Sequence, residues 1–147
     1  MNPLTKHKIG QDYRIKMIDW MVEVCGSFKF RERTYFLAVA LFDKYLLLKA
    51  KQGKCLSNQE VHAIGVTAMY TASKYEDLAP IHSKIVSDKI THNTISRKEI
   101  KNMELEMLQD FSFSIDFVTP LDFTMAYYER IEHEYYKCTK VKISSMV

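Results

Sequence analysis

Glycine and proline are scarce in this chain, and the residues between them repeat with a helical period. Only four glycines and three prolines occur among 147 residues. Between these positions, apolar side chains recur at intervals of three and four, which is the spacing of one face of an α-helix. A sheet-rich fold would need more frequent turn residues. The sequence therefore predicts an all-α protein.

Size and charge favour one soluble domain. Apolar residues make up 47% of the chain, which is enough for one well-filled core at this length. The net charge of +3 arises from 21 basic and 18 acidic residues mixed along the sequence, so no nucleic-acid partner is expected. No apolar run is long enough to cross a bilayer, and residues 1–10 lack the apolar segment of a secretion signal. We expect a soluble intracellular protein without a membrane partner, with Cys25, Cys55 and Cys138 reduced.

The predicted first helix, residues 12–28, carries two apolar strips. It begins at Asp12 as N-cap and ends near Gly26. The first strip contains Ile15, Ile18, Val22 and Cys25. The second strip contains Met17, Trp20, Met21 and Val24. One core requires only one strip, so this helix either lies between two parts of its own domain or contacts a second structure.

Capping signals place the later helices. Ser57 with Glu60, and Ser96 with Glu99, have the spacing of capping boxes. A further helix begins with Thr119 as N-cap, Pro120 first and Asp122 third. Lysines 49, 51 and 54 fall in a solvated connector before residue 57. The predicted helices after the first are residues 32–48, 57–75, 83–90, a helix from residue 96, and 119–137.

The third of these helices has small residues in its middle. Gly65, Ala68 and Ala72 follow one another at helical spacing. Glycine inside a helix costs about 1 kcal/mol relative to alanine, so its presence indicates close approach by neighbouring helices. We predict that this helix is central.

The sequence contains no recognisable catalytic or metal-binding motif. His133 and Glu134 begin like a zinc-protease helix, but Lys137 stands where the second histidine is needed. No cysteine pair has zinc-ribbon spacing, and no glycine-rich loop could cradle phosphate. We therefore predict a protein that is not an enzyme, with no catalytic residue, metal or cofactor. The other histidines are predicted to be surface or rim residues: His7, His62, His82 and His92.

The order of residues in three helices resembles the N-terminal cyclin box. The family's first-helix pattern, Met-Arg-Ala-Ile-Leu, an aliphatic residue and Asp-Trp-Leu-Val-Glu-Val, is kept or changed conservatively at Arg14, Met17, Ile18, Asp19, Trp20, Val22, Glu23 and Val24. The third helix matches at Gly65, Ala68, Ala72, Ser73, Lys74, Tyr75, Glu76 and Asp77, and the fifth at Met103 and Glu104.

This resemblance implies a fold of five helices with the third surrounded by the others. It divides the chain into an N-terminal extension at 1–11, a cyclin box at 12–115, and a linker with the partial or degenerate start of a second box at 116–147. Cell-cycle cyclins carry two boxes, so we expect either a one-box protein or a piece of a two-box chain.

The resemblance also implies a regulatory subunit that binds and activates a cyclin-dependent protein kinase, in the nucleus, the cytoplasm or both. The residues matching the kinase-binding side are Lys74, Tyr75, Glu76, Leu78, Glu104, Phe111, Phe113 and Ile115. Lys74 and Glu104 have an alternative role as an internal ion pair. Phe111 and Phe113 have an alternative place in the core.

Cyclins of the mitotic and S-phase type also dock Arg-x-Leu peptides of substrates and inhibitors on the first helix. The matching residues are Tyr13, Lys16, Met17, Trp20, Glu23, Val61 and His62. Glu23 could pair with the peptide's basic residue. Lys16 replaces an aliphatic residue and would repel that base, weakening docking or changing the preferred motif. An alternative is that Trp20 packs against the N-terminal extension.

A second function remains open. The chain could be a cyclin-box module of a transcription or scaffold protein that binds nucleic acid or protein without activating a kinase. Lys74, Glu104 and Trp20 favour the kinase regulator, whereas the cluster of lysines at 49, 51 and 54 is a weak electrostatic footprint for nucleic acid.

Overall fold

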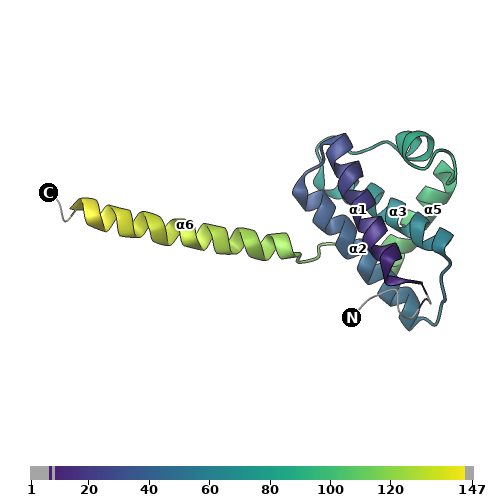
Figure 1. Cartoon of the computed structure of the whole chain (residues 1–147), viewed down its shortest axis with the longest axis horizontal. Coiled ribbons are helices and arrows are strands. Elements are labelled where there is room, and N and C mark those ends of the chain that lie inside the picture. Colours follow the sequence, from purple (N-terminus) through teal and green to yellow (C-terminus); the bar gives the residue numbers. More distant parts are fainter. Residues whose placement is uncertain (1–6, 8, 145–147) are drawn as a thin grey trace. The chain divides into compact units, whose positions relative to one another are not determined.

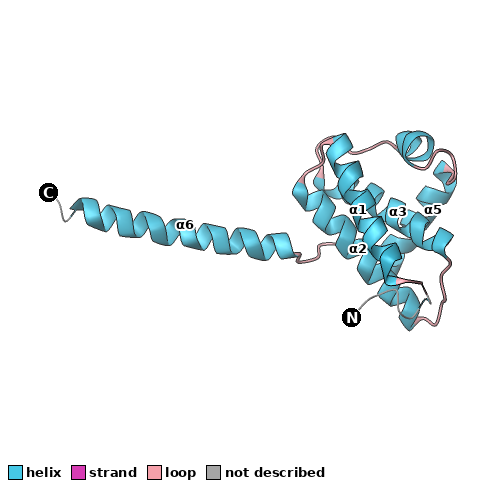
Figure 2. Cartoon of the chain, in the orientation of Figure 1, coloured by secondary structure: helices cyan, strands magenta, loops and turns pink. Residues whose placement is uncertain are grey.

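The computed structural model consists of helices and loops (Figure 2). It describes the backbone of residue 7 and residues 9–144, and the side chains of these residues except residue 11 and residues 138–144. No strand occurs in this described part, so the all-α prediction is confirmed. The helices are α1 (Gln11–Phe28), α2 (Glu32–Lys51), α3 (Asn58–Glu76), α4 (Ser83–Ile85), the π-helix η2 (Val86–Ile90), α5 (Arg97–Asp110) and α6 (Pro120–Ser144).

The predicted capping boxes begin α3 and α5. The backbone N–H of Ser57 donates to the Glu60 carboxylate at 2.8 Å, and the N–H of Glu60 donates to the Ser57 hydroxyl at 3.3 Å. Ser96 and Glu99 repeat this exchange at 2.7 and 3.2 Å. Each cap satisfies backbone donors that lack helical partners, so both helix starts follow from local sequence.

The ends of α1 and α6 differ from the prediction. Gly10, rather than Asp12, is the N-cap of α1, and Asp12 lies in the first helical turn, where a negative charge is also favourable. Thr119 does contact Asp122 as predicted, with its N–H donating to the carboxylate at 2.7 Å. However, α6 continues beyond the predicted end at Lys137, because no glycine or proline follows to stop it.

The third helix is central, as predicted. Every residue of α3 from 64 to 73 is buried, and α3 contacts α1, α2 and α5 (Figure 1). A Cβ atom added to Gly65 would overlap the terminal methyl of Met17 in α1. The missing side chain thus makes room for Met17, and this close approach explains why a helix-weakening glycine occurs here.

The two apolar strips of α1 have different surroundings. Met17, Met21 and Val24 of the second strip belong to the core. In the first strip, Ile15 is 50% exposed and Val22 is 53% exposed. The helix is therefore not enclosed on both sides within its domain, and the first strip retains an open apolar face.

His7 is buried, which contradicts the prediction that it lies on the surface or rim. Its Nε2 lies 2.8 Å from the Leu46 carbonyl, and its Nδ1 accepts the Leu56 N–H at 3.3 Å. Because a backbone N–H can only donate, Nδ1 carries no proton, and the N–H at Nε2 donates to the Leu46 carbonyl. His7 thus links the second half of α2 to the segment that leads into α3. His62 is half-buried, and His82 and His92 are exposed.

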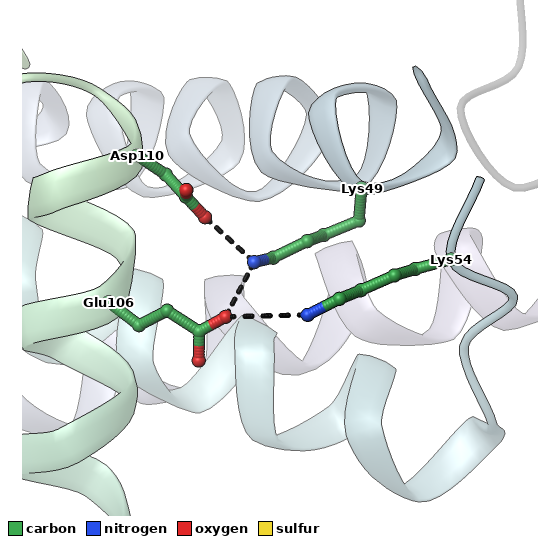
Figure 3. Close-up of polar contacts among 4 residues, drawn as sticks. All are labelled: Lys49, Lys54, Glu106 and Asp110. Atoms are coloured by element: carbon green, nitrogen blue, oxygen red, sulfur yellow. Dashed lines mark hydrogen bonds and ion pairs between the residues drawn. The ribbon is translucent and has the colours of Figure 1, made fainter. Parts of the chain in front are cut away.

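Lys49 is also buried, so the prediction of a solvated position is wrong. It lies within α2, 4% exposed, and its ammonium donates to Glu106 at 2.5 Å and to Asp110 at 2.7 Å in α5 (Figure 3). Lys54, in the following loop, approaches Glu106 at 3.8 Å. Two carboxylates on a distant helix supply the charge that this burial requires. We call these four side chains the Lys49 network.

The chain divides into two units, Met1–Phe117 and Val118–Val147. The first contains α1 to α5 and both hydrophobic clusters, and the second contains α6. The predicted boundaries at residues 12 and 116 remain predictions, and most of the predicted extension lies outside the described residues. In the described part, no helix is both long and apolar enough to cross a membrane.

Candidate protein-binding surfaces

Lys74 and Glu104 meet across the helices α3 and α5. The Lys74 ammonium lies 2.6 Å from the Glu104 carboxylate, which also accepts the Thr71 hydroxyl at 3.1 Å. The side chain of Glu104 is 10% exposed, and that of Lys74 is 39% exposed. Lys74 also lies 4.6 Å from the centre of the Tyr70 ring. The predicted internal ion pair therefore exists, and it holds a partly accessible ammonium at the end of α3.

Three of the predicted kinase-binding residues are apolar and exposed. Tyr75 is exposed beside Lys74, and Leu78, two residues beyond α3, is 89% exposed. Phe113 is exposed because Ser112 and Phe113 both adopt left-handed conformations, with φ of 52° and 59°, and turn the chain after α5. Such a conformation is uncommon for a bulky residue and costs free energy. This backbone holds an aromatic ring in solvent.

The other three predicted kinase-binding residues are buried or half-buried. Phe111 packs edge-on against Tyr45 and Phe117, with ring centres 5.9 and 5.3 Å apart. Ile115 is buried in the main core cluster, and Glu76 is half-buried. Between the two alternatives for the phenylalanines, Phe111 lies against the core and Phe113 faces outward.

The seven predicted docking residues come together on α1 and the first half of α3. The Tyr13 hydroxyl donates to the Asn58 carbonyl at 2.8 Å, and the rings of Trp20 and His62 meet edge-on with centres 5.8 Å apart. Burial lowers the pKa of His62, so this ring is neutral at pH 7. The remaining four divide by exposure: Lys16 and Glu23 are exposed, whereas Met17 and Val61 are buried.

We call the surface around these seven residues the shelf. The burial of Met17 and Val61 limits the apolar area that the shelf can offer to a peptide. Both side chains are part of the core cluster against which Trp20 packs, so they do not form the surface. Trp20 and His62 are half-buried and Lys16 is exposed, so the two rings and the Lys16 stem can supply apolar contact area.

A groove of about 330 Å³ continues from Trp20 and Glu23 toward the π-helix. Its opposite wall includes Lys89, Ile90 and His92, which the sequence analysis did not select. No periodic pattern marks them, because they lie in and after the short helix η2, where His92 has a left-handed φ of 48°. We call this the Trp20 groove.

Arg14 of α1 forms an ion pair with Asp43 of α2. Its guanidinium donates two hydrogen bonds to the Asp43 carboxylate, at 2.8 and 2.6 Å. This bidentate hydrogen bonding raises the pKa of Arg14 further. Both side chains are partly buried, so the pair sets the position of the helix that carries Trp20 and Glu23.

No site for a metal ion is present among the residues that the structure describes: no three or more His, Cys, Asp or Glu side chains converge there. The thiol of Cys25 is half-buried, and burial raises its pKa to about 11. It is therefore protonated at neutral pH. Cys138 lies outside the described side chains.

Comparison with known proteins agrees with the fold and the residue order. The family described as "Cyclin, N-terminal domain" matches residues 2–116. A G2/mitotic-specific cyclin-B2 of Anguilla japonica is 32% identical over 118 residues, covering 80% of this chain and 28% of the relative. A putative cyclin-A3-1 of Arabidopsis thaliana is 35% identical over 109 residues, covering 73% and 28%. The chain thus spans less than a third of these curated relatives.

A solved structure has the same fold. The viral cyclin of herpesvirus saimiri superposes with a TM-score of 0.70, covering 84% of this chain and 52% of the viral chain. The two sequences are 20% identical, so this similarity concerns the arrangement of helices alone.

Proposed function

This chain belongs to the cyclin family, and on that premise we propose that it binds a cyclin-dependent protein kinase and activates it. The observation that carries the proposal is the Lys74–Glu104 pair, which keeps an accessible ammonium at the end of α3. Tyr75 beside Lys74, Leu78 after α3 and Phe113 after α5 offer exposed apolar area. A surface with one fixed cation and exposed aromatic groups is well suited to a protein partner.

The proposed mechanism is a shift between two states of the kinase. Kinase catalysis requires an ion pair between a lysine and a glutamate on a mobile helix. A partner that binds only the inward position of that helix raises the population of the active state. Moving such an equilibrium from about 1% to 99% requires roughly 5.5 kcal/mol of differential binding. In this proposal the effect on the kinase arises from the contact between the two proteins.

The alternative, a module that binds nucleic acid without activating a kinase, loses support from the burial of Lys49. Of the three lysines that could have formed a basic face, Lys49 is paired internally with Glu106 and Asp110, and Lys54 lies near Glu106. A pull-down with the purified chain, followed by mass spectrometry, separates the two functions. We expect a kinase of the cyclin-dependent family, and capture of nucleic-acid-bound complexes without a kinase would favour the alternative.

We further propose that the Trp20 groove and the adjoining shelf bind a short docking segment. Glu23 can pair with a basic residue, and the Trp20 and His62 rings can cover an apolar one. Lys16 on the shelf and Lys89 on the groove wall oppose a peptide that brings its own cation. Arg-x-Leu peptides should therefore bind weakly.

Replacing Lys16 with isoleucine should tighten the binding of an Arg-x-Leu peptide by about 1 kcal/mol, or roughly fivefold. Removal of one solvated like-charge contact and addition of a modest apolar area each contribute about that amount or less. Trp20→Ala should abolish binding. Calorimetric titration measures all three affinities, with Lys51→Ile as the control because Lys51 is exposed on α2. Unchanged affinity in the Lys16 variant would mean either that this face is not a peptide site or that the Lys16 side chain points away into solvent.

A further inference from the structure

A second concave site lies between α1 and α2, and it shares no residue with the two surfaces above. Its volume is about 420 Å³. Its apolar wall consists of Val22 and Cys25 from α1, Phe30 from the connecting loop, and Tyr35 and Phe36 from α2. This volume is at the lower end of the range for ligand pockets, so it fits one or two large side chains. We call it the Val22 pocket.

The loop at the mouth of the pocket is held in place by hydrogen bonds. Lys29 has a left-handed φ of 54°, and the N–H of Phe30 donates to the Cys25 carbonyl at 3.0 Å. The Arg31 N–H donates to the Asp77 carboxylate at 3.2 Å, and the Thr34 hydroxyl donates to it at 2.6 Å. The pocket is therefore preformed, and a ligand would not have to order this loop.

One apolar side chain at the pocket, that of Val22, is largely exposed. Val22 belongs to the first strip of α1 and is 53% exposed, although it lies next to a concave surface lined with aromatic rings. A single exposed valine needs no explanation, but one at the edge of a preformed pocket adds to an accessible apolar surface.

The charged side chains at the pocket are mainly positive. Lys29 and Arg31 both line it and are exposed, and in the described part of the chain no carboxylate forms an ion pair with either of them. Glu32 is the acidic residue that lines the pocket, and the nearby Asp77 carboxylate already accepts the Arg31 N–H and the Thr34 hydroxyl. Burial keeps the Cys25 thiol protonated, since its pKa is raised to about 11. Two available cations beside an apolar wall favour a ligand that combines apolar and acidic groups.

We propose that the Val22 pocket binds an extended segment of a partner protein in which a large apolar side chain is flanked by carboxylates. The apolar side chain enters between Val22, Tyr35 and Phe36. The carboxylates face Lys29 and Arg31 at the mouth. This docking is separate from kinase activation, because none of these residues is among those proposed to contact the kinase.

Fluorescence anisotropy tests the proposal with three pools of fluorescein-labelled peptides. In the first pool, a Leu, Ile, Phe or Trp residue is flanked by glutamates; in the second it is flanked by lysines; in the third, the glutamates flank alanine. We expect the first pool to bind at least about tenfold more tightly than the other two, with affinity falling as salt is added. Equal binding of the three pools, or none, would overturn the proposal.

Matched variants locate the binding. Val22→Glu adds a charge at the pocket wall, whereas Ile15→Glu adds the same charge to the same strip at an equally exposed position that does not line the pocket. We expect Val22→Glu to lose at least about tenfold in affinity, and Ile15→Glu to bind normally. Reversing Lys29 and Arg31 to glutamate should remove the preference for acidic peptides. Equal losses in the Val22 and Ile15 variants would contradict the assignment.

Two further measurements distinguish other occupants of the pocket. Sedimentation that shows self-association dependent on Val22 would assign the pocket to a second copy of the chain instead. Tighter binding of a labelled oligonucleotide than of the acidic peptides would assign the basic mouth to nucleic acid.

Kinase activation by the Val22→Glu variant should equal that of the wild type, so failure of this proposal and failure of the kinase proposal can be told apart.

Discussion

Replacing Lys49 with methionine should lower the free energy of unfolding by about 2 kcal/mol. The Lys49 ammonium is buried and donates to Glu106 and Asp110, and it lies 4.7 Å from the centre of the Tyr45 ring. Methionine keeps the length of the side chain but removes both charge-assisted hydrogen bonds. Breaking a fully buried pair costs about 3–5 kcal/mol. The cost here should be smaller because the Glu106 side chain is 51% exposed and regains water.

This loss should depend on pH in a defined way. The hydrogen bond from Lys49 holds the pKa of Asp110 below its ordinary value of 3.8. The stability that the ionised Asp110 contributes is therefore fully present above pH 3.8 and is lost as the pH falls through the lower pKa of the folded state. The pKa of Lys49 is raised above 10.5, so its contribution is present below that value and is lost at still higher pH. The difference between wild type and variant should be constant from about pH 5 to pH 9 and shrink in acid.

Urea unfolding of both proteins across this pH range provides the measurement. Lys54→Met is the matched control, because Lys54 is exposed and only approaches Glu106, so its removal should cost no more than about 0.5 kcal/mol. If Lys49→Met is as stable as the wild type at pH 7, the ion pairs only offset the cost of burying the lysine, and the network does not stabilise the fold.

Replacing Lys74 and Glu104 together with alanine should weaken the kinase complex by one to two orders of magnitude. Hydrogen bonds to charged groups contribute about 1.5–3 kcal/mol each, and the loss of one or both at the interface gives this range. The double replacement is the sharper test, because removing Lys74 alone would leave the buried Glu104 carboxylate with Thr71 as its remaining partner. The helical circular dichroism spectrum should be retained.

Surface plasmon resonance against a candidate kinase measures this effect, with Lys101→Ala as the control for an exposed lysine on α5. The control should bind normally. Collapse of the helical signal in the double variant would show that the pair is structural. A folded double variant with normal affinity would show that the kinase binds elsewhere.

Features that depend on neighbours in sequence could be predicted from the sequence. The capping boxes at Ser57 and Ser96 need only a partner three residues later, and both form. Gly65 in a helical pattern indicated a close neighbour because the glycine weakens the helix, and Met17 occupies the space it leaves. The order of residues in α1 and α3 identified the family.

Features that depend on distant parts of the chain could not be predicted in this way. Lys49 resembled a solvated lysine because its partners, Glu106 and Asp110, are 57 and 61 residues away. The burial of His7 depends on the Leu46 and Leu56 backbone groups, and nothing near His7 in the sequence reveals them. Lys89 and His92 belong to an irregular segment whose position beside Trp20 depends on the whole fold.

The most direct test of the account is the activation of a kinase by the purified chain. The chain is mixed with individual monomeric cyclin-dependent kinases, and the rate of histone phosphorylation is measured as its concentration rises. We predict a saturable increase for at least one kinase, displaced to higher concentration in the Lys74 and Glu104 double variant. If no member of that kinase family binds the chain or gains activity, kinase regulation is contradicted and the cyclin relationship describes the fold alone.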